Sequence, residues 1–427
     1  MNRVVGSTFA ALRVRSFAIL FWGSFFSFTA FFMSTVVQSI VAFQLTGRNG
    51  AVGVVLLGQG LAMALLGPLG GAVADRVPKK LVSVVTQLVI ACVFLAIGML
   101  VAAGAVTIAF LALGSFVVGT MFAFMGPARQ AWVVELVGPE LRANAVALTQ
   151  VMLNASRVIA PAFAGLLVAI AVVGAAGAYF VMASFYVVVV LSFLLLPRSR
   201  RPEASGRSVM GDLVAGFRYV GGEPRLRAMM LLFFLMIMLG LSAYAAVLPG
   251  LVENQLGRSV EAYGTLQAVN AAGGLVASLF VAPLAGTRRA FPAYALMAAI
   301  TGISIVLTGL APTYLIAFVP ILMNGVAFGA FQTLNSAVIV LESDPAYYGR
   351  VTSLTSLAFA GFMLAGFPVG LLADALGERV ALVILGLLTT AAVIVMTPII
   401  ARASRAARHA EPACGRGAAR ERVTPSR

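Results

Sequence analysis

Twelve long stretches of apolar residues, separated by charged or glycine- and proline-containing breaks, dominate this chain of 427 residues. A helix that crosses the hydrocarbon core of a bilayer needs about 20 such residues. The runs cover 17–43, 51–73, 81–103, 105–127, 144–170 and 173–196, then 227–251, 262–285, 290–310, 313–340, 351–373 and 379–401. The sequence therefore predicts an all-α membrane protein with twelve transmembrane helices.

Composition excludes the soluble classes of protein. Hydrophobic residues make up 61% of the chain and charged residues only 10%, whereas soluble domains are about one quarter charged. The high apolar content also excludes a disordered chain. The single histidine, His409, lies in the C-terminal tail, which excludes histidine-based catalytic triads and histidine metal sites. We therefore expect no enzyme activity, no metal and no bound cofactor.

The charged breaks divide the chain into four parts. Residues 1–196 are predicted to form a first six-helix bundle, and residues 227–401 a second one. Between them, 197–226 is predicted to be a charged connecting loop. The arginine-rich stretch 402–427 has little apolar content and is predicted to be a disordered tail.

An internal repeat supports the division into two halves. Gln44 precedes Gly53 by nine residues, and Gln255 precedes Gly264 by nine. A second set occurs in the same order later in each half: Glu135, Pro139, Arg142, Pro161 and Gly165 in the first, and Glu342, Pro345, Arg350, Pro368 and Gly370 in the second. Repeats of this kind predict two pseudo-symmetric six-helix bundles in parallel orientation.

The distribution of lysine and arginine predicts the orientation. Of the 29 such residues, only Arg48, Arg258 and Arg379 lie in breaks on the side away from the termini, and Arg157 lies inside a run. The others lie on the side of the termini, and loops rich in lysine and arginine stay in the cytoplasm. We therefore expect a cell inner (plasma) membrane protein with cytoplasmic termini, and the net charge of +15 indicates contact with anionic lipid rather than nucleic acid.

The most specific motif follows the second run: Gly71-Ala-Val-Ala-Asp75-Arg76-Val-Pro78-Lys79-Lys80. It resembles the G-x-x-x-D-R-x-G-R-R loop of the major facilitator superfamily, with Pro78 in place of the usual glycine. The resemblance extends over almost the whole chain, through twelve helices, two halves and a long central loop. It implies that Gly71, Asp75, Arg76, Lys79 and Lys80 form a conformational latch between the halves. The alternative is that the cations only fix the topology.

A second segment narrows the resemblance. Residues 127–144 and 154–165 resemble the drug and siderophore exporter branch, which includes macrolide-efflux and enterobactin-exporter proteins. This resemblance implies that Arg129 and Arg142 lie in a cytoplasmic loop, and that Pro161 with Gly165 forms a bend and close-packing site in the fifth helix. Pro368 and Gly370 are the matching residues of the second half. No arginine is then expected inside the fourth helix, where proton-coupled drug antiporters commonly carry one.

Arg157 is the ionisable residue that the sequence places inside an apolar run. It follows Arg142 by fifteen residues, which is about 22 Å of helix, well inside a core about 30 Å thick. A lipid-facing arginine there costs at least about 2.5 kcal/mol, so the side chain should face the bundle interior. Gln150, Asn154 and Arg157 share one helical face, typical of a cavity wall. The alternative is that Arg157 only ties helices together.

Further polar residues inside the runs are candidates for the same substrate cavity. Each of them alone is more often an interhelical hydrogen bond than a ligand. They are Gln38, Gln59, Gln267, Asn270, Asn324, Gln332 and Asn335.

These features predict a secondary active transporter that exports a small apolar or amphipathic solute by alternating access. All carboxylates lie in loops, helix ends or tails, so neutral or anionic solutes are expected over cations. With the proton gradient as energy source, the coupling groups would be carboxylates near the membrane faces, such as Asp75 or Glu253. The alternatives are a lysolipid or lipid flippase, and a non-transporting membrane sensor or scaffold. The expected partners are the small-molecule substrate and the bilayer, and the expected state is a monomer.

Overall fold

The computed structural model describes residues 9–410 except 75, 171, 198, 200–208, 260–261, 285–286, 288 and 344–346. All regular structure in the described residues is helical, as predicted. The first half contains η1 (Ala10–Arg13), α2 (Arg15–Thr46), α3 (Asn49–Ala74), α4 (Lys79–Ala102), α5 (Ile108–Leu136), η2 (Pro139–Leu141), α6 (Arg142–Ala169) and α7 (Gly174–Leu194).

The second half follows the connecting segment. It contains α9 (Pro224–Leu235), η3 (Met236–Leu241), α10 (Ser242–Gly250), η4 (Leu251–Gln255), α11 (Ala262–Val281), η5 (Ala282–Leu284), α12 (Ala290–Leu310), α13 (Tyr314–Glu342), α14 (Tyr348–Leu376) and α15 (Glu378–Ala410). The elements α9 to η4 form one continuous span with two π-helical turns. Such turns occur where a helix adjusts its register, frequently at functional sites.

Twelve helices of the described chain are long and apolar enough to cross a membrane, which confirms the predicted number. Many of their large apolar side chains are exposed, among them Leu65, Leu279 and Ile394. A soluble protein would bury such residues, whereas a bilayer solvates them. Length and hydropathy alone therefore specify these helices.

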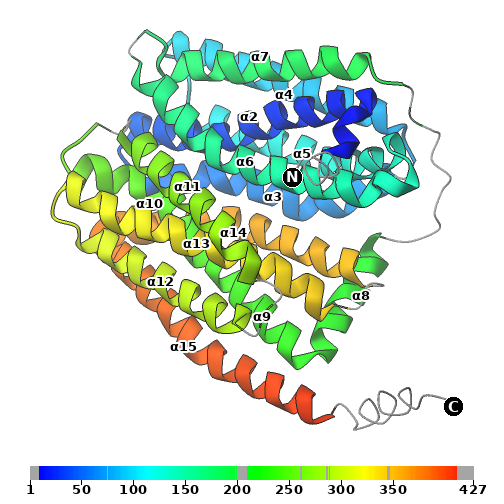
Figure 1. Cartoon of the computed structure of the whole chain (residues 1–427). Helices are drawn as coiled ribbons and strands as arrows, with labels where there is room; N and C mark the ends of the chain where they lie inside the picture. The colour runs from blue at the N-terminus through cyan, green and yellow to red at the C-terminus, as the bar shows by residue number, and fades with distance from the viewer. Residues whose placement is uncertain are drawn as a thin grey trace, which may run out of the picture.

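The two halves lie against each other as separate bundles, coloured blue to green and green to red in Figure 1. The same helix pairs are in contact in each: α3 with α5 corresponds to α11 with α13, and α4 with α7 corresponds to α12 with α15. The halves meet through α3 with α14 and through α6 with α11. This matching pattern is the pseudo-symmetry that the sequence repeat predicts.

Two ends of the molecule are distinguished below. The basic end is where α2 begins, and the opposite end is where α2 ends and α3 begins. The connecting segment is not only a loop, because α8 (Val209–Gly222) forms there and contacts both α14 and α3. The last helix, α15, continues to Ala410 and so extends into the predicted tail, whose remainder lies outside the described residues.

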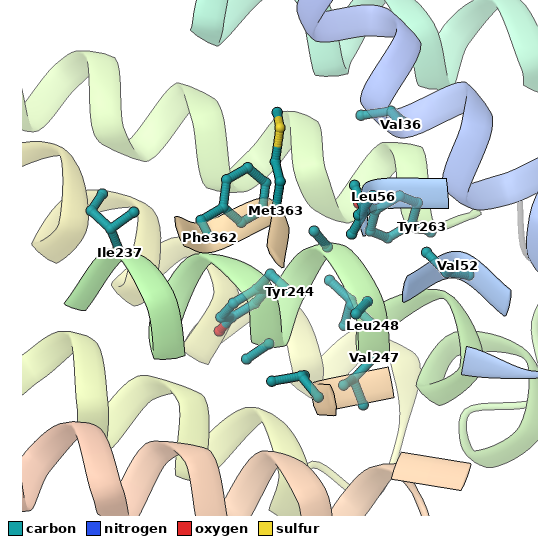
Figure 2. Close-up of a cluster of buried hydrophobic side chains, with 14 of the residues drawn as sticks. Val36, Val52, Leu56, Ile237, Tyr244, Val247, Leu248, Tyr263, Phe362 and Met363 are labelled. Atoms are coloured by element: carbon teal, nitrogen blue, oxygen red, sulfur yellow. The ribbon is translucent and has the colours of Figure 1, made fainter. Parts of the chain in front are cut away.

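Apolar side chains from both halves form one core between them. Figure 2 shows this cluster, with residues of α2 and α3 facing residues of α10, α11 and α14. Its labelled members on the first half are Val36, Val52 and Leu56, and on the second half they include Tyr244, Leu248, Tyr263 and Met363. Packing rather than polar contact therefore joins much of the boundary between the halves.

Candidate functional site

Arg157 lies at the boundary between the two halves. It projects from α6 of the first half, and its guanidinium carbon is 5.5 Å from the ring centroid of Phe32 on α2. The same carbon is 4.6 Å from the ring of Phe359, which belongs to α14 of the second half. Its Nε atom is buried and has no hydrogen-bond partner among the described residues. The guanidinium is thus covered by two aromatic faces, one from each half.

The other two residues of the predicted α6 face are placed differently. Gln150 is exposed and lies two turns from Arg157, nearer the basic end. The side chain of Asn154 lies outside the described residues. The structure therefore brings Arg157, but not Gln150, into the core of the molecule.

Most of the other candidate cavity residues make hydrogen bonds inside their own half. Gln38 of α2 accepts a hydrogen bond from the Ser115 hydroxyl of α5 at 2.8 Å. Asn270 of α11 donates to Asn324 of α13 at 3.0 Å. Asn324 in turn donates to Ser304 of α12 at 2.9 Å. These contacts hold each bundle together, which is the interhelical role that such polar residues have more often than ligand binding.

The four remaining candidates are fully or partly buried. Asn335 of α13 accepts from the Tyr294 hydroxyl at 3.3 Å. Gln59 is buried with its Nε2 unpartnered, and the same holds for Oε1 of Gln267, within the described residues. Gln332 is half-buried. Gln59 on α3 and Gln267 on α11 thus lie on helices that contact the other half.

Arg129 corrects one expectation from the sequence. Helix α5 does not end near Pro127 but continues through it to Leu136, so Arg129 lies inside the fourth span and not in a loop. It is 3% exposed. Proline is tolerated inside membrane helices because neighbouring groups satisfy the freed carbonyl. The apolar residues 131–134 after Arg129 were the signal that the helix continues.

The environment of Arg129 explains how a charge fits in that helix. Its Nη2 donates to the Ser27 hydroxyl at 3.3 Å, and its guanidinium lies 5.1 Å from the Phe28 ring and 5.5 Å from the Phe193 ring. Ser27 also receives a hydrogen bond from Gln87 of α4 at 3.1 Å. These contacts offset part of the several kcal/mol that a buried charge costs. Arg157 is therefore not the only ionisable residue inside a span.

Glycine residues set the close contact between the halves at the opposite end. A Cβ added at Gly165 of α6 would lie 2.6 Å from Cα of Gly264 on α11. A Cβ at Gly53 of α3 would lie 2.6 Å from the carbonyl oxygen of Gly366 on α14. Gly67, nearer the basic end of α3, has nothing within 4 Å of that position. The two crossings therefore depend on glycine at the opposite end.

Two carboxylates reinforce the contact at that end. Asp374, at the end of α14, accepts hydrogen bonds from the backbone N–H of Asn49 at 2.7 Å and of Gly50 at 2.9 Å. These are the first N–H groups of α3, which have no partner within their own helix, and the α3 dipole favours a negative charge there. Glu378 accepts from the side-chain amide of Asn49 at 3.1 Å and from that of Asn254 at 2.6 Å.

This cluster of Asn49, Gly50, Asn254, Asp374 and Glu378 was not among the candidates from the sequence. Its residues lie at helix ends, where charge and amide groups are common, and only the fold brings α3, η4, α14 and α15 together. Gly370 belongs to the same contact, because a Cβ there would lie 3.0 Å from Cα of Gly50. The opposite end is therefore closed in this structure.

Two cations of the predicted latch, Lys79 and Lys80, bind within their own half. Lys79 forms an ion pair with Glu135 at 2.6 Å, between the start of α4 and the end of α5. Lys80 donates to the carbonyl oxygen of Leu194 at the end of α7 at 2.8 Å. Arg76 is exposed, Gly71 lies in α3, and Asp75 lies outside the described residues. Within the described residues, no group of three or more His, Cys, Asp or Glu side chains could hold a metal.

Comparison with known proteins identifies the family. A family profile described as transmembrane secretion effector matches residues 6–413. The enterobactin exporter EntS of Shigella boydii is 28% identical over 221 residues, which is 51% of each chain, and EntS of Escherichia coli gives the same figures. The chain thus matches about half the length of these curated relatives.

Solved structures with the same fold cover nearly the whole chain. A bacterial homolog of the human lysosomal transporter Spinster, in an inward-facing and unoccupied conformation, has a TM-score of 0.71 at 16% identity, covering 91% of this chain and 97% of that one. The nucleoside transporter NupG has a TM-score of 0.71 at 14% identity, covering 90% and 99%. With twelve spans in two matching halves, the chain belongs to the transmembrane secretion effector family of the major facilitator superfamily, whose members are membrane transporters and not enzymes.

Proposed function

We propose that this protein exports a small apolar or amphipathic solute, neutral or anionic, by alternating access between its two halves. The observation that carries the proposal is the position of Arg157, midway along α6 and between aromatic rings from both halves. Because Arg157 contacts both halves, its surroundings change when the halves move relative to each other. Its cation attracts carboxylate, phosphate or catecholate oxygens and repels cations.

The carboxylates of the described chain support the same preference. They lie at helix ends or in connections, as Glu135, Glu253 and Asp374 do. A desolvated cationic solute needs a carboxylate at the depth where it binds, because burial of an uncompensated charge is costly. The similarity to enterobactin exporters fits this proposal, and export of a siderophore-like or drug-like solute is its concrete form.

The test compares solutes of different charge in the same cells. Cells that express the protein should accumulate less of a neutral or anionic fluorescent solute than cells without it. Accumulation of a permanent quaternary ammonium dye should be the same in both. Strong export of the quaternary dye would refute the charge preference, and no effect on any solute panel would favour a sensor or scaffold instead.

We also propose that the basic end faces the cytoplasm, so that the closed end of this structure faces away from the cell interior. A cysteine-free variant (Cys92→Ala, Cys414→Ser) carrying Gly221→Cys should resist an impermeant thiol reagent in intact cells and react after permeabilisation. The matched variant Arg258→Cys, at the opposite end, should react in intact cells. The reverse pattern would contradict the orientation.

The latch at the basic end is proposed to act in the other conformational state. Here the opposite end is closed, and Lys79 and Lys80 bind only their own half. If the motif holds the basic end shut in the outward-open state, Asp75→Asn should reduce export at least about tenfold, as expected when a charged hydrogen bond worth about 1.5–3 kcal/mol is lost. Expression and membrane insertion should be unchanged, as an immunoblot of membranes would show. A normal export rate would argue against the latch.

A further inference from the structure

Arg129 is a buried cation whose counter-charge is missing from the described residues. Its Nη2 donates to the Ser27 hydroxyl at 3.3 Å and to the Met125 thioether at 3.1 Å, and both are neutral acceptors. Its Nε and Nη1 atoms are buried without a partner in the described chain. Glu135, the acid that follows it on α5, is paired with Lys79. The two aromatic faces offset part of the cost of this burial, but they supply no hydrogen-bond acceptor for the N–H groups of Nε and Nη1.

Other unpartnered donors lie on the same side of the bundle. The Trp132 indole Nε1, one turn further along α5, is buried without a partner in the described chain. The Trp132 ring lies 5.7 Å from the Phe193 ring, which also covers Arg129. On α4, the Ser83 hydroxyl is buried and unpartnered too. Its neighbour Val82 packs with Ala128, the residue before Arg129. Unsatisfied buried donors of this kind are uncommon in native proteins.

We propose that Arg129, Trp132 and Ser83 bind a small monatomic anion such as chloride inside the first half. The donors outnumber the acceptors around Arg129, so an occupant must accept hydrogen bonds and carry negative charge. A halide can accept from one edge of the guanidinium, which offers either Nε or Nη1, and also from the Trp132 indole and the Ser83 hydroxyl. It has no donor of its own that would be left without a partner. An oxyanion brings several oxygens, each needing a donor, into a site whose remaining walls are the rings of Phe28 and Phe193. This site is separate from Arg157 and does not rest on the proposed transport function.

The intrinsic fluorescence of Trp132 can report whether an anion binds at this site. The protein has two tryptophans, and Trp22 on α2 is exposed whereas Trp132 is fully buried. In the Trp22→Phe variant, the fluorescence therefore comes from Trp132 alone. Iodide and bromide quench tryptophan only on contact. The full-length purified variant is kept in sodium gluconate and titrated with iodide, with acrylamide as the neutral quencher.

The expected result is saturable quenching of Trp132 by iodide, reversed by chloride, with little quenching by acrylamide. The matched control is Trp132→Phe, in which Trp22 should show no saturable phase. Ser83→Ala should raise the half-saturating iodide concentration by about tenfold, since it removes a hydrogen bond to a charged group. Arg129→Met should abolish saturation, whereas Arg157→Met should preserve it.

The titration of Trp22→Phe decides the proposal even if Arg129→Met fails to fold. Absence of a saturable phase in Trp22→Phe would overturn it, and would indicate that water fills the site. Quenching that rises linearly and equally with iodide and acrylamide would overturn it as well. Saturation that persists in Arg129→Met would show that the halide binds elsewhere.

Discussion

Arg157→Ala is expected to reduce export of an anionic solute by roughly ten- to a hundredfold. Removing one partner of a buried charged pair costs about 3–5 kcal/mol in proteins, and even half of that exceeds a tenfold change. Export of a neutral solute should fall less, because it loses packing but no charge partner. Initial efflux rates from preloaded cells, normalised to the amount of protein in the membrane, measure the effect.

The control for Arg157→Ala separates charge at the site from charge in general. Arg402→Ala removes the same group from the exposed end of α15 and should leave the rate within about twofold of the wild type. Arg157→Lys keeps the charge but loses the planar fork, so an intermediate rate is expected. Wild-type export of both solutes by Arg157→Ala would show that Arg157 only packs against Phe32 and Phe359.

Gly165→Val is expected to abolish transport while both halves remain folded. The new Cβ would lie 2.6 Å from the Gly264 backbone, where something must shift. Overpacking of this kind costs about 1–3 kcal/mol or more. The strain falls on the contact between α6 and α11, so it is relieved when the halves separate at the opposite end. The closed state of that end becomes rare, and a transporter that cannot close one end cannot complete its cycle.

The measurement pairs the export rate with labelling of Val52→Cys, a position buried between the halves on α3. In the Gly165→Val background, in a chain without its native cysteines, an impermeant thiol reagent should label this position. In the Gly67→Val background the position should stay protected and export should continue, because Gly67 has nothing within 4 Å of its missing Cβ. Equal protection and equal export in the two backgrounds would mean that the crossing tolerates a side chain.

The sequence by itself determined the number of spans and the two halves. In a bilayer the backbone N–H and C=O groups of a single span must form hydrogen bonds within the span itself. A long apolar run therefore forms a transmembrane helix. The repeat also carried information about contact between the halves. Gly53 and Gly264, which match in the two halves, both lie at crossings, and so do Gly165 and Gly370. Glycine at a crossing is needed because two backbones approach there, and a repeated fold repeats that need.

The sequence left the boundary of α5 undecided, because the apolar residues 131–134 favour continuation of the helix whereas Pro127 and Arg129 favour its end. A proline followed by an arginine is typical of a helix end at the membrane surface. Whether the helix continues depends on groups far along the chain, here Ser27 and Phe193, which accept the N–H and cover the cation of Arg129. Only the tertiary structure supplies them.

The tertiary structure alone decided which polar residues face the other half. Hydropathy measures how apolar a helix is as a whole. It does not say which face of a membrane helix contacts lipid, which contacts its own bundle and which contacts the opposite half. Gln38 and Asn270 look alike in the sequence as buried amides, and both bond inside their own bundle. Asp374 and Asn49 look like ordinary helix ends, yet they join the halves. Their roles follow from which helix ends meet, and that is fixed by the packing of the whole chain.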